Sequence, residues 1–422
     1  MLNKDKIFLY LDWAIIASLC ILFFCLPFAK AGAESFTLLA FFLWIIKKIL
    51  GYRVEALWGM LPRTELNKVL AIFIAANALS VIFSSHLGLS LRAFFGKELK
   101  FLAIYFMLVE VINSKKRLKV VLITVIVSAL LLVLDAGVQY SRGLDFLRGF
   151  PLNRLTASFQ TANGFAGWLI VVILLFLGLL ISDKIIGKGL KVLLLMLIPL
   201  LGGCLLGTYA RGAWLGFAIG VFFIVVYAFK GFSFKIKLLC VSISVFFLAT
   251  CLIFPQALLS RVKALGRINF KSSETVNARV KSTLKIDAGS TPIRLKLWKE
   301  ALRITRDYPL FGCGLNTYSK IGPKYKSFDW GGVYPHNSYL QMSAEIGLIG
   351  LFAFLWVLFS FFKVGLRHFN QKKDYLALGL LAGILAFLVH AFFDTHLYSL
   401  QLVVLFWYML GLTVAVIKLN LE

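Results

Sequence analysis

A histidine, two arginines and an aspartate near the ends of apolar segments could carry group-transfer chemistry. His336 follows Pro335 at the start of an apolar run, and an imidazole can accept a proton from a sugar hydroxyl near neutral pH. Arg211 opens another apolar segment, where a guanidinium and the free N–H groups of a helix start together form an anion site. Arg294 opens the basic segment 294–306. Each also has an ordinary interpretation, as an interfacial histidine, an arginine at a membrane boundary or a base on a solvated helix face.

The arginines are most informative as a group. Five of them are expected on one side of the protein, and they are Arg142, Arg148, Arg154, Arg211 and Arg294. Together they could neutralise a pyrophosphate, which carries two or more negative charges and leaves as an anion in glycosyl transfer.

Asp394 has two interpretations. One is a metal site with His390 and His396, since His390 and Asp394 are one helical turn apart. His396 would point away from that pair on a continuous helix, so the sequence favours a role for Asp394 in orienting a histidine or an arginine, with no metal. The chain has no P-loop, GxSxG, HExxH or DxD-like motif, and we therefore expect no cofactor.

The composition places these residues in a membrane protein. Hydrophobic residues make up 60% of the 422 residues and charged residues only 15%. Apolar windows long enough to cross about 30 Å of hydrocarbon as helix recur along the chain, so we expect an all-α, polytopic transmembrane bundle and not a β-barrel. The formal net charge of +26 does not indicate nucleic acid. The bases lie between apolar segments or in one long loop, where the available anions are membrane lipids and lipid-linked substrates.

The apolar windows predict about twelve spans. Their expected bounds are 7–28, 35–50, 68–84, 98–112, 118–139, 163–182, 190–207, 212–229, 236–254, 341–362, 375–393 and 396–417. The second is short and ends in two lysines, and the fourth contains Glu110. These spans divide the chain into nine helices within 1–254, a long basic loop over 255–340 and three helices within 341–422.

The positive charges predict the orientation. Among the short connections, those on the side of both termini carry most of the Lys and Arg residues, which places the termini in the cytoplasm. The long loop then falls on the external side. Within it, the segment 294–306 combines leucines, an isoleucine and a tryptophan with bases, which predicts an amphipathic helix that lies on the membrane or caps the bundle.

Three sequence blocks stand out, in a fixed order. They are ARGAWLGF at 210–217, RLKLWKEALRITRDYPLFGCGLNTY at 294–318 and PHNSYLQMSAEIGLIGL at 335–351. Their order and spacing resemble the O-antigen ligase and polymerase superfamily of polytopic membrane proteins. The residues that carry the resemblance are Arg211 and Leu215 of an Arg-x3-Leu element, and His336, Asn337, Gly347 and Gly350 of a His-Asn-x9-Gly-x2-Gly element. A fourth block, TASFQTANGFAGWL at 156–169, is a weaker match.

The resemblance implies a twelve-helix protein of the bacterial inner membrane with a long periplasmic loop, acting on a glycan linked to undecaprenyl pyrophosphate without a metal ion. It implies that His336 is the general base for the acceptor hydroxyl and that Asp394 is a supporting acidic residue on the same, periplasmic side. The expected substrate-binding residues are Arg154, Arg211, Arg294 and Asn337.

Two activities fit the resemblance. A ligase moves the completed glycan onto the lipid A core oligosaccharide, and a polymerase moves it onto another lipid-linked repeat. The single long basic loop favours a ligase, because it could engage the phosphorylated inner core of lipopolysaccharide. A lipid-linked oligosaccharide flippase would line the membrane midplane with charge rather than the external rim, and Glu110 is the main charge well inside a predicted span. Three motif blocks on one face argue against a structural scaffold. The sequence leaves the oligomeric state open.

Overall fold

The computed structural model describes residues 4–51, 61–147, 149, 154–182, 185–228, 290–327 and 334–419. The longer helices in these ranges are α1 (Lys4–Phe28), α2 (Lys30–Gly51), α3 (Asn67–Ile82), α5 (Leu99–Val111), α6 (Lys115–Arg142), α7 (Ala162–Ile181), α8 (Lys188–Gly207), α9 (Arg211–Ala228), α13 (Ser290–Asp307), α15 (Ser338–Lys372), α16 (Tyr375–Ala391) and α17 (Leu400–Leu419). The short elements are α4 (Leu87–Ala93), η2 (Phe94–Glu98), α14 (Tyr318–Ile321), η3 (Gly322–Tyr325) and η4 (His396–Tyr398). The predicted all-α class is confirmed over the described ranges.

Seven helices are long and apolar enough to cross a membrane, and they are α1, α6, α7, α8, α9, α15 and α17. Helices α3 and α16 are apolar but shorter. Every predicted span within the described residues coincides with a helix, although α15 continues well beyond its predicted end. Helices α2 and α5, which correspond to the second and fourth predicted spans, are not among the seven. The predicted span 236–254 lies outside the described residues, so the number twelve stays a prediction.

Helices α7, α16 and α17 form the centre of the bundle. The apolar window of α17 is 94% buried and that of α7 is 78% buried, against 28% for α8 and α9. A Cβ atom on Gly178 of α7 would lie 2.6 Å from the carbonyl oxygen of Tyr375, and one on Gly216 of α9 would lie 2.4 Å from that of Ala386. Backbones approach this closely only through small residues, which is how helices commonly associate in lipid. The position of α16 is therefore fixed between α7 and α9.

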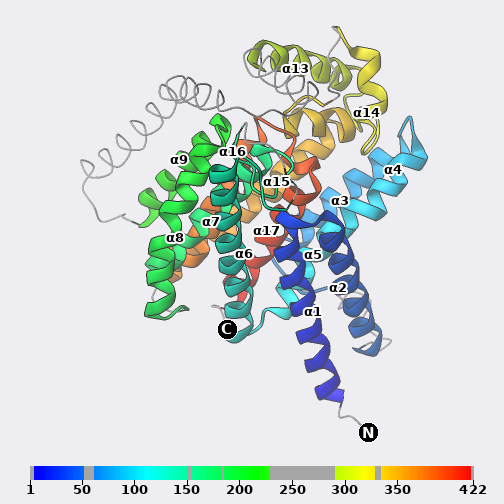
Figure 1. Cartoon of the computed structure of the whole chain (residues 1–422). Helices are drawn as coiled ribbons and strands as arrows, with labels where there is room; N and C mark the ends of the chain where they lie inside the picture. Colours follow the sequence, from blue (N-terminus) through cyan, green and yellow to red (C-terminus); the bar gives the residue numbers. More distant parts are fainter. Residues whose placement is uncertain are drawn as a thin grey trace.

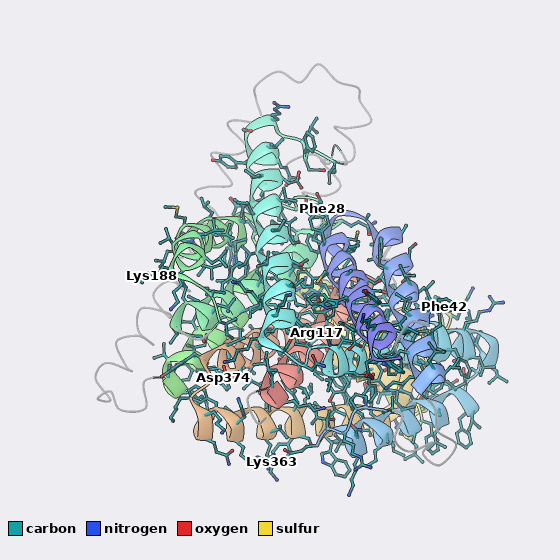
Figure 2. All side chains as sticks on the ribbon, turned by 90° about the horizontal axis from the view of Figure 1, so that it is seen from below. Phe28, Phe42, Arg117, Lys188, Lys363 and Asp374 are labelled. Atoms are coloured by element: carbon teal, nitrogen blue, oxygen red, sulfur yellow. The ribbon has the colours of Figure 1, made fainter. Side chains whose placement is uncertain are left out.

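The two ends of the bundle differ. Both termini lie at one end, and α13 and α14 lie at the other (Figure 1). Figure 2 looks onto the end that holds the termini, with Arg117 near the centre, Lys188 at the left, Asp374 at the lower left and Lys363 at the bottom. Helices α7, α9 and α15 begin at the α13 end, so their free N–H groups face the same region.

A group of paired charges ties α1, α2, α5 and α6 together. Glu110 lies 2.9 Å from Nζ of Lys47 and 2.5 Å from Nζ of Lys48. Asp12 pairs with Lys47 at 2.6 Å and with Arg117 at 3.0 Å. Charges within membrane helices are tolerated when they are paired in this way. Glu110, in the last turn of α5, is thus paired with bases of α2 and is not a free charge within the bundle.

Helix α15 is broken at Gly347, where φ is +69°. The loop that follows α13 enters this break, because the Leu348 N–H donates to the carbonyl of Pro309 at 2.8 Å. A Cβ atom on Gly347 would lie 2.1 Å from the carbonyl oxygen of Leu310. The first glycine of the His-Asn-x9-Gly-x2-Gly element therefore allows backbone pairing between the loop and α15, and this pairing fixes the first turns of α15.

Replacing Gly347 with alanine should destabilise the protein. The backbone angles of Gly347, φ +69° and ψ −178°, are adopted almost only by glycine and cost another residue about 1–3 kcal/mol, and the clash with the Leu310 carbonyl adds to that cost. We expect the melting temperature of the purified protein in detergent to fall by several degrees. Gly202→Ala is the matched control, since nothing lies within 4 Å of a Cβ at that position. Equal melting temperatures for the two variants would contradict this account of the motif.

The predicted amphipathic helix is present as α13. Its residues Leu297, Ala301 and Ile304 are buried, and the last two pack in one cluster with Ala344 of α15. Leu302 on the opposite face is 52% exposed. Of the two predicted arrangements, α13 has the one in which the helix caps the bundle. The preceding part of the long loop, 255–289, lies outside the described residues.

Candidate active site

His336 and Asp394 meet at the end of the bundle that α13 covers. Nδ1 of His336 lies 3.0 Å from Oδ1 of Asp394. His336 immediately precedes the Asn337 cap of α15, and Asp394 lies in the turn between α16 and η4. The imidazole is 38% exposed and the carboxylate 15% exposed. The pair therefore combines an accessible imidazole with a largely buried acid.

Further hydrogen bonds hold the carboxylate of Asp394. Its Oδ2 accepts from Nδ2 of Asn163 at 2.6 Å, and its Oδ1 accepts from the N–H of Thr395 at 2.8 Å. Burial alone would raise the pKa of Asp394, but the hydrogen bonds from His336 and Asn163 hold that pKa well below its usual range. An ionised carboxylate only accepts hydrogen bonds, so Nδ1 of His336 carries its proton. In the neutral form of the ring, Nε2 then carries the free lone pair.

The backbone around His336 fixes the direction of the imidazole. His336 has φ of +49°, a left-handed conformation that residues other than glycine adopt rarely. Helix α15 follows at once, and Ser338 Oγ donates to the carbonyl oxygen of Asp394 at 2.8 Å. The start of α15 and the turn after α16 are thus joined twice, by the side chains of His336 and Ser338.

Asn337 is the N-cap of α15. Its Oδ1 accepts from the N–H groups of Tyr339 and Leu340, each at 3.0 Å, which is the usual function of an asparagine at this position. The residue is fully buried, and its Nδ2 has no hydrogen-bond partner among the described residues. Asn337 therefore positions His336 through the helix start, and a contact with substrate stays a prediction.

Arg154 is connected to the His336–Asp394 pair through Asn163. Its Nη2 donates to Oδ1 of Asn163 at 3.0 Å, and its Nε donates to the carbonyl oxygen of Thr208 at 2.7 Å. Asn163, in the first turn of α7, thus bridges a guanidinium and a carboxylate. The sequence singled out the surrounding block at 156–169 but not Asn163 itself, and that block is the signal that could have identified it.

Arg211 reaches the site as the first residue of α9. Its neighbour Gly212 packs against the residue before Asp394, since a Cβ atom on Gly212 would lie 2.9 Å from Cβ of Phe393. The side chain of Arg211 is exposed and forms no ion pair within the described residues. Of the other predicted arginines, Arg142 lies in the exposed last turn of α6, and Arg148 lies outside the described residues.

Arg294 approaches from α13. One turn later on this helix, Trp298 contacts Phe392 with ring centroids 5.3 Å apart, which places the start of α13 over the end of α16. Burial lowers the pKa of His396 to about 4, and the positive charge of Arg294 contributes to this shift against the opposing charge of Asp394. In the part of the chain that the structure describes, Arg294 has no carboxylate partner.

The side chains of His390 and His396 are hydrogen-bonded to each other. Nε2 of His396 lies 2.9 Å from Nδ1 of His390, so these two nitrogens are not free to bind a common metal ion with Asp394. Within the described ranges, no group of three His, Cys, Asp or Glu side chains is arranged to hold a metal ion. The contact of Asp394 is instead with His336.

The arrangement can perform acid–base and anion chemistry at one place. The oriented imidazole can remove a proton from a hydroxyl, and the charges of Arg211 and Arg294 can stabilise an anion that departs nearby. His336 contacts Asp394 in the turn between α16 and η4, and the starts of α9 and α13, which carry Arg211 and Arg294, pack against Phe393 and Phe392 beside it.

Comparison with known families gives one finding. Residues 192–355 match the family model described as O-Antigen ligase. The matched segment contains Arg211, Arg294 and His336, whereas Asn163 lies before it and Asp394 lies after it. No curated protein matches the chain.

Proposed function

Since residues 192–355 of this chain belong to the O-antigen ligase family, we propose that the protein is a ligase that transfers a glycan from undecaprenyl pyrophosphate to the lipid A core oligosaccharide. One observation carries the proposal. An accessible imidazole, oriented by a buried carboxylate, lies at the same end of the bundle as two arginines that have no carboxylate partner among the described residues.

The proposed reaction is a single displacement at the anomeric carbon. Nε2 of His336 takes the proton of the acceptor hydroxyl as its oxygen forms a bond to that carbon, and the bond from the carbon to the pyrophosphate oxygen breaks. The anomeric configuration is inverted. Asp394 stabilises the imidazolium that forms, because its carboxylate already accepts the hydrogen bond from Nδ1.

The leaving group is the second part of the proposal. Undecaprenyl pyrophosphate departs with its charge, and the guanidinium groups of Arg211 and Arg294 stabilise that charge. We propose that the transfer is independent of a metal ion, since fixed guanidinium charges can serve this purpose. Arg154 contributes to the position of Asp394 through Asn163, to which its guanidinium is hydrogen-bonded.

The proposed location is the bacterial inner membrane, with the site on the periplasmic side and both termini in the cytoplasm. Two features support this orientation. Both termini lie at the end of the bundle opposite α13 (Figure 1), and the short connections on the side of the termini hold most of the bases.

The test is a transfer assay with purified protein, a glycan linked to undecaprenyl pyrophosphate, EDTA, and lipid A core as the added acceptor. Glycan on the lipid A core is the expected product. A longer lipid-linked glycan with an unmodified core would make the protein a polymerase, which is the alternative within the superfamily. Folded protein that yields neither product would contradict both activities.

Asn163→Ala should slow the transfer without unfolding the protein. The substitution removes one of the hydrogen bonds that hold Asp394, so Asp394 and His336 can move out of alignment, and a displacement of 1 Å can cost about 100-fold in rate. We expect kcat to fall by about 10- to 100-fold with little change in melting temperature. Gln160→Ala, at a nearby exposed position, is the control, and an equal effect of both substitutions would refute a positioning role.

A further inference from the structure

A cavity of about 150 Å³ lies beside the candidate active site, between α3, η2, α5, α15 and α17. Its polar lining includes Asn77, Glu98, Glu345 and Tyr398, and its apolar lining includes Phe73 and Trp407. None of these residues takes part in the proposed reaction. We call it the Glu98 cavity.

The polar groups of the Glu98 cavity divide into two kinds. Glu345 is fully engaged, because its carboxylate accepts from the N–H of Asn316 at 2.7 Å and from Nε2 of Gln341 at 3.1 Å. By contrast, the carboxylate of Glu98 and the hydroxyl of Tyr398 have no hydrogen-bond partner among the described residues. Both residues are half-buried, so these two groups are available to a ligand or to water.

Asn77 adds a third available group. The residue is 1% exposed and its Nδ2 donates to the carbonyl of Phe73 at 2.9 Å, which leaves Oδ1 without a partner in the described part of the chain. Two of the three available groups, Oδ1 of Asn77 and the carboxyl oxygens of Glu98, accept hydrogen bonds. The cavity therefore suits a molecule rich in donors, such as hydroxyl groups.

The charged residues that line the cavity and its volume limit further which ligands can bind there. Glu34, Glu98 and Glu345 line the cavity together with Lys97, and Glu34 is paired with Lys100. Carboxyl groups thus outnumber ammonium groups in the lining, which favours a hydroxyl-bearing ligand over a phosphate or pyrophosphate. The cavity of about 150 Å³ has the size of engineered cavities that bind benzene, so it limits the ligand to no more than one sugar ring. Aromatic side chains such as Phe73 and Trp407 offer apolar surface to the C–H faces of such a ring.

The cavity is also joined to the candidate active site. Tyr398 belongs to η4, which directly follows the Asp394 turn. The N–H of Leu397, another lining residue, donates to Oγ of Ser338 at 3.3 Å, and that hydroxyl also donates to the carbonyl oxygen of Asp394. A molecule in the cavity would thus lie against the element that carries Asp394.

From these features we propose that the Glu98 cavity is a binding subsite for one uncharged sugar ring, held by hydrogen bonds from its hydroxyls to Glu98, Tyr398 and Asn77. The inference rests on the proposed function only in identifying the glycan substrate as the source of that ring. The proposed subsite agrees with the distribution of charged residues. In it the arginines of the active site bind the anionic pyrophosphate, and the carboxyl groups of the Glu98 cavity bind neutral hydroxyls.

The test is direct binding to the full-length protein in a detergent without a sugar head group, measured by saturation-transfer NMR. The probes are galactose, rhamnose, N-acetylglucosamine and inorganic phosphate. We expect ring-hydrogen signals from at least one sugar, weakened at least fivefold in Tyr398→Phe and in Glu98→Gln, and no competition from phosphate. Glu65→Gln, at an exposed position far from this cavity, should bind as the original protein does.

Other results would overturn the subsite. No signal from any of the three sugars would mean that the cavity holds only water, and equal signals in Tyr398→Phe would place the sugar elsewhere. Tyr398→Phe preserves shape, so it serves if Glu98→Gln does not fold. The measurement needs neither donor nor acceptor lipid. Transfer without sugar binding would therefore refute the subsite alone, and sugar binding without transfer would refute the proposed function alone.

Discussion

His336→Gln should reduce glycan transfer by about 100- to 10,000-fold, the usual contribution of a general base. Glutamine approximates the size of the imidazole and can still donate to Asp394, but it cannot take up a proton at the position of Nε2. The site should therefore keep its structure while losing the proton acceptor. The measurement is the initial rate of transfer to lipid A core at saturating donor, together with the affinity for the donor, which we expect to be nearly unchanged.

The chain contains a matched control for this substitution. His368 and Asp374 form a second histidine–aspartate pair, with Nε2 of His368 3.2 Å from Oδ2 of Asp374, near the opposite end of α15. This pair is buried, so His368→Gln should lower stability while the activity of the folded fraction persists. If His336→Gln behaved in the same way, the pair at the α13 end would be a structural contact and the proposed mechanism would be wrong.

The membrane helices could be predicted from the sequence because hydrocarbon imposes a simple requirement. A span needs about 20 consecutive apolar residues, and continuous runs such as those of α7 and α17 satisfy it without reference to the rest of the fold. Helix α2 is not among the seven helices that are apolar enough to span a membrane. It contains two lysines, Lys47 and Lys48, near its end. Those lysines pair with Asp12 and Glu110, and such partners on other helices are not visible in a single sequence.

The sequence was a better guide to which residues lie at the candidate site than to what each of them does there. Histidine, arginine and aspartate near span ends are unusual enough to be noticed, and the structure brings them together around the turn at Asp394. Asn163 was missed because an uncharged amide at a helix start is ordinary. Its importance depends on the meeting of the start of α7 with the end of α16, which is a property of packing and not of local sequence.

Asn337 shows the opposite case. It was predicted to bind substrate, which stays a prediction, and the structure adds that its side-chain oxygen caps α15. An asparagine directly before a long apolar helix is a strong N-cap signal, and local reasoning could have identified that role. The motif thus combines one residue for chemistry with others, Asn337 and Gly347, that hold the helix start and its break in place.

Arg294→Ala should lower transfer by about 100- to 1,000-fold, which is the usual cost of removing one positioned group that stabilises developing charge. The pyrophosphate gains charge as its bond to the anomeric carbon breaks, so the loss should appear mainly in kcat. Arg294→Lys should recover part of the activity, because a lysine supplies the charge without the planar pair of donors that suits phosphate oxygens.

Lys299→Ala is the control that separates a positioned charge from general attraction of an anionic lipid. Lys299 lies on the same helix, carries the same charge and is exposed, but Arg294 is the base of α13 whose charge acts on His396. We expect Lys299→Ala to change the rate by less than about threefold, because surface charges in high dielectric contribute little. This effect should become smaller still at high salt, where surface charges are screened. Similar losses for Arg294→Ala and Lys299→Ala would mean that α13 acts only through its net charge. The leaving group would then have to be stabilised by Arg211 and by residues elsewhere in the site.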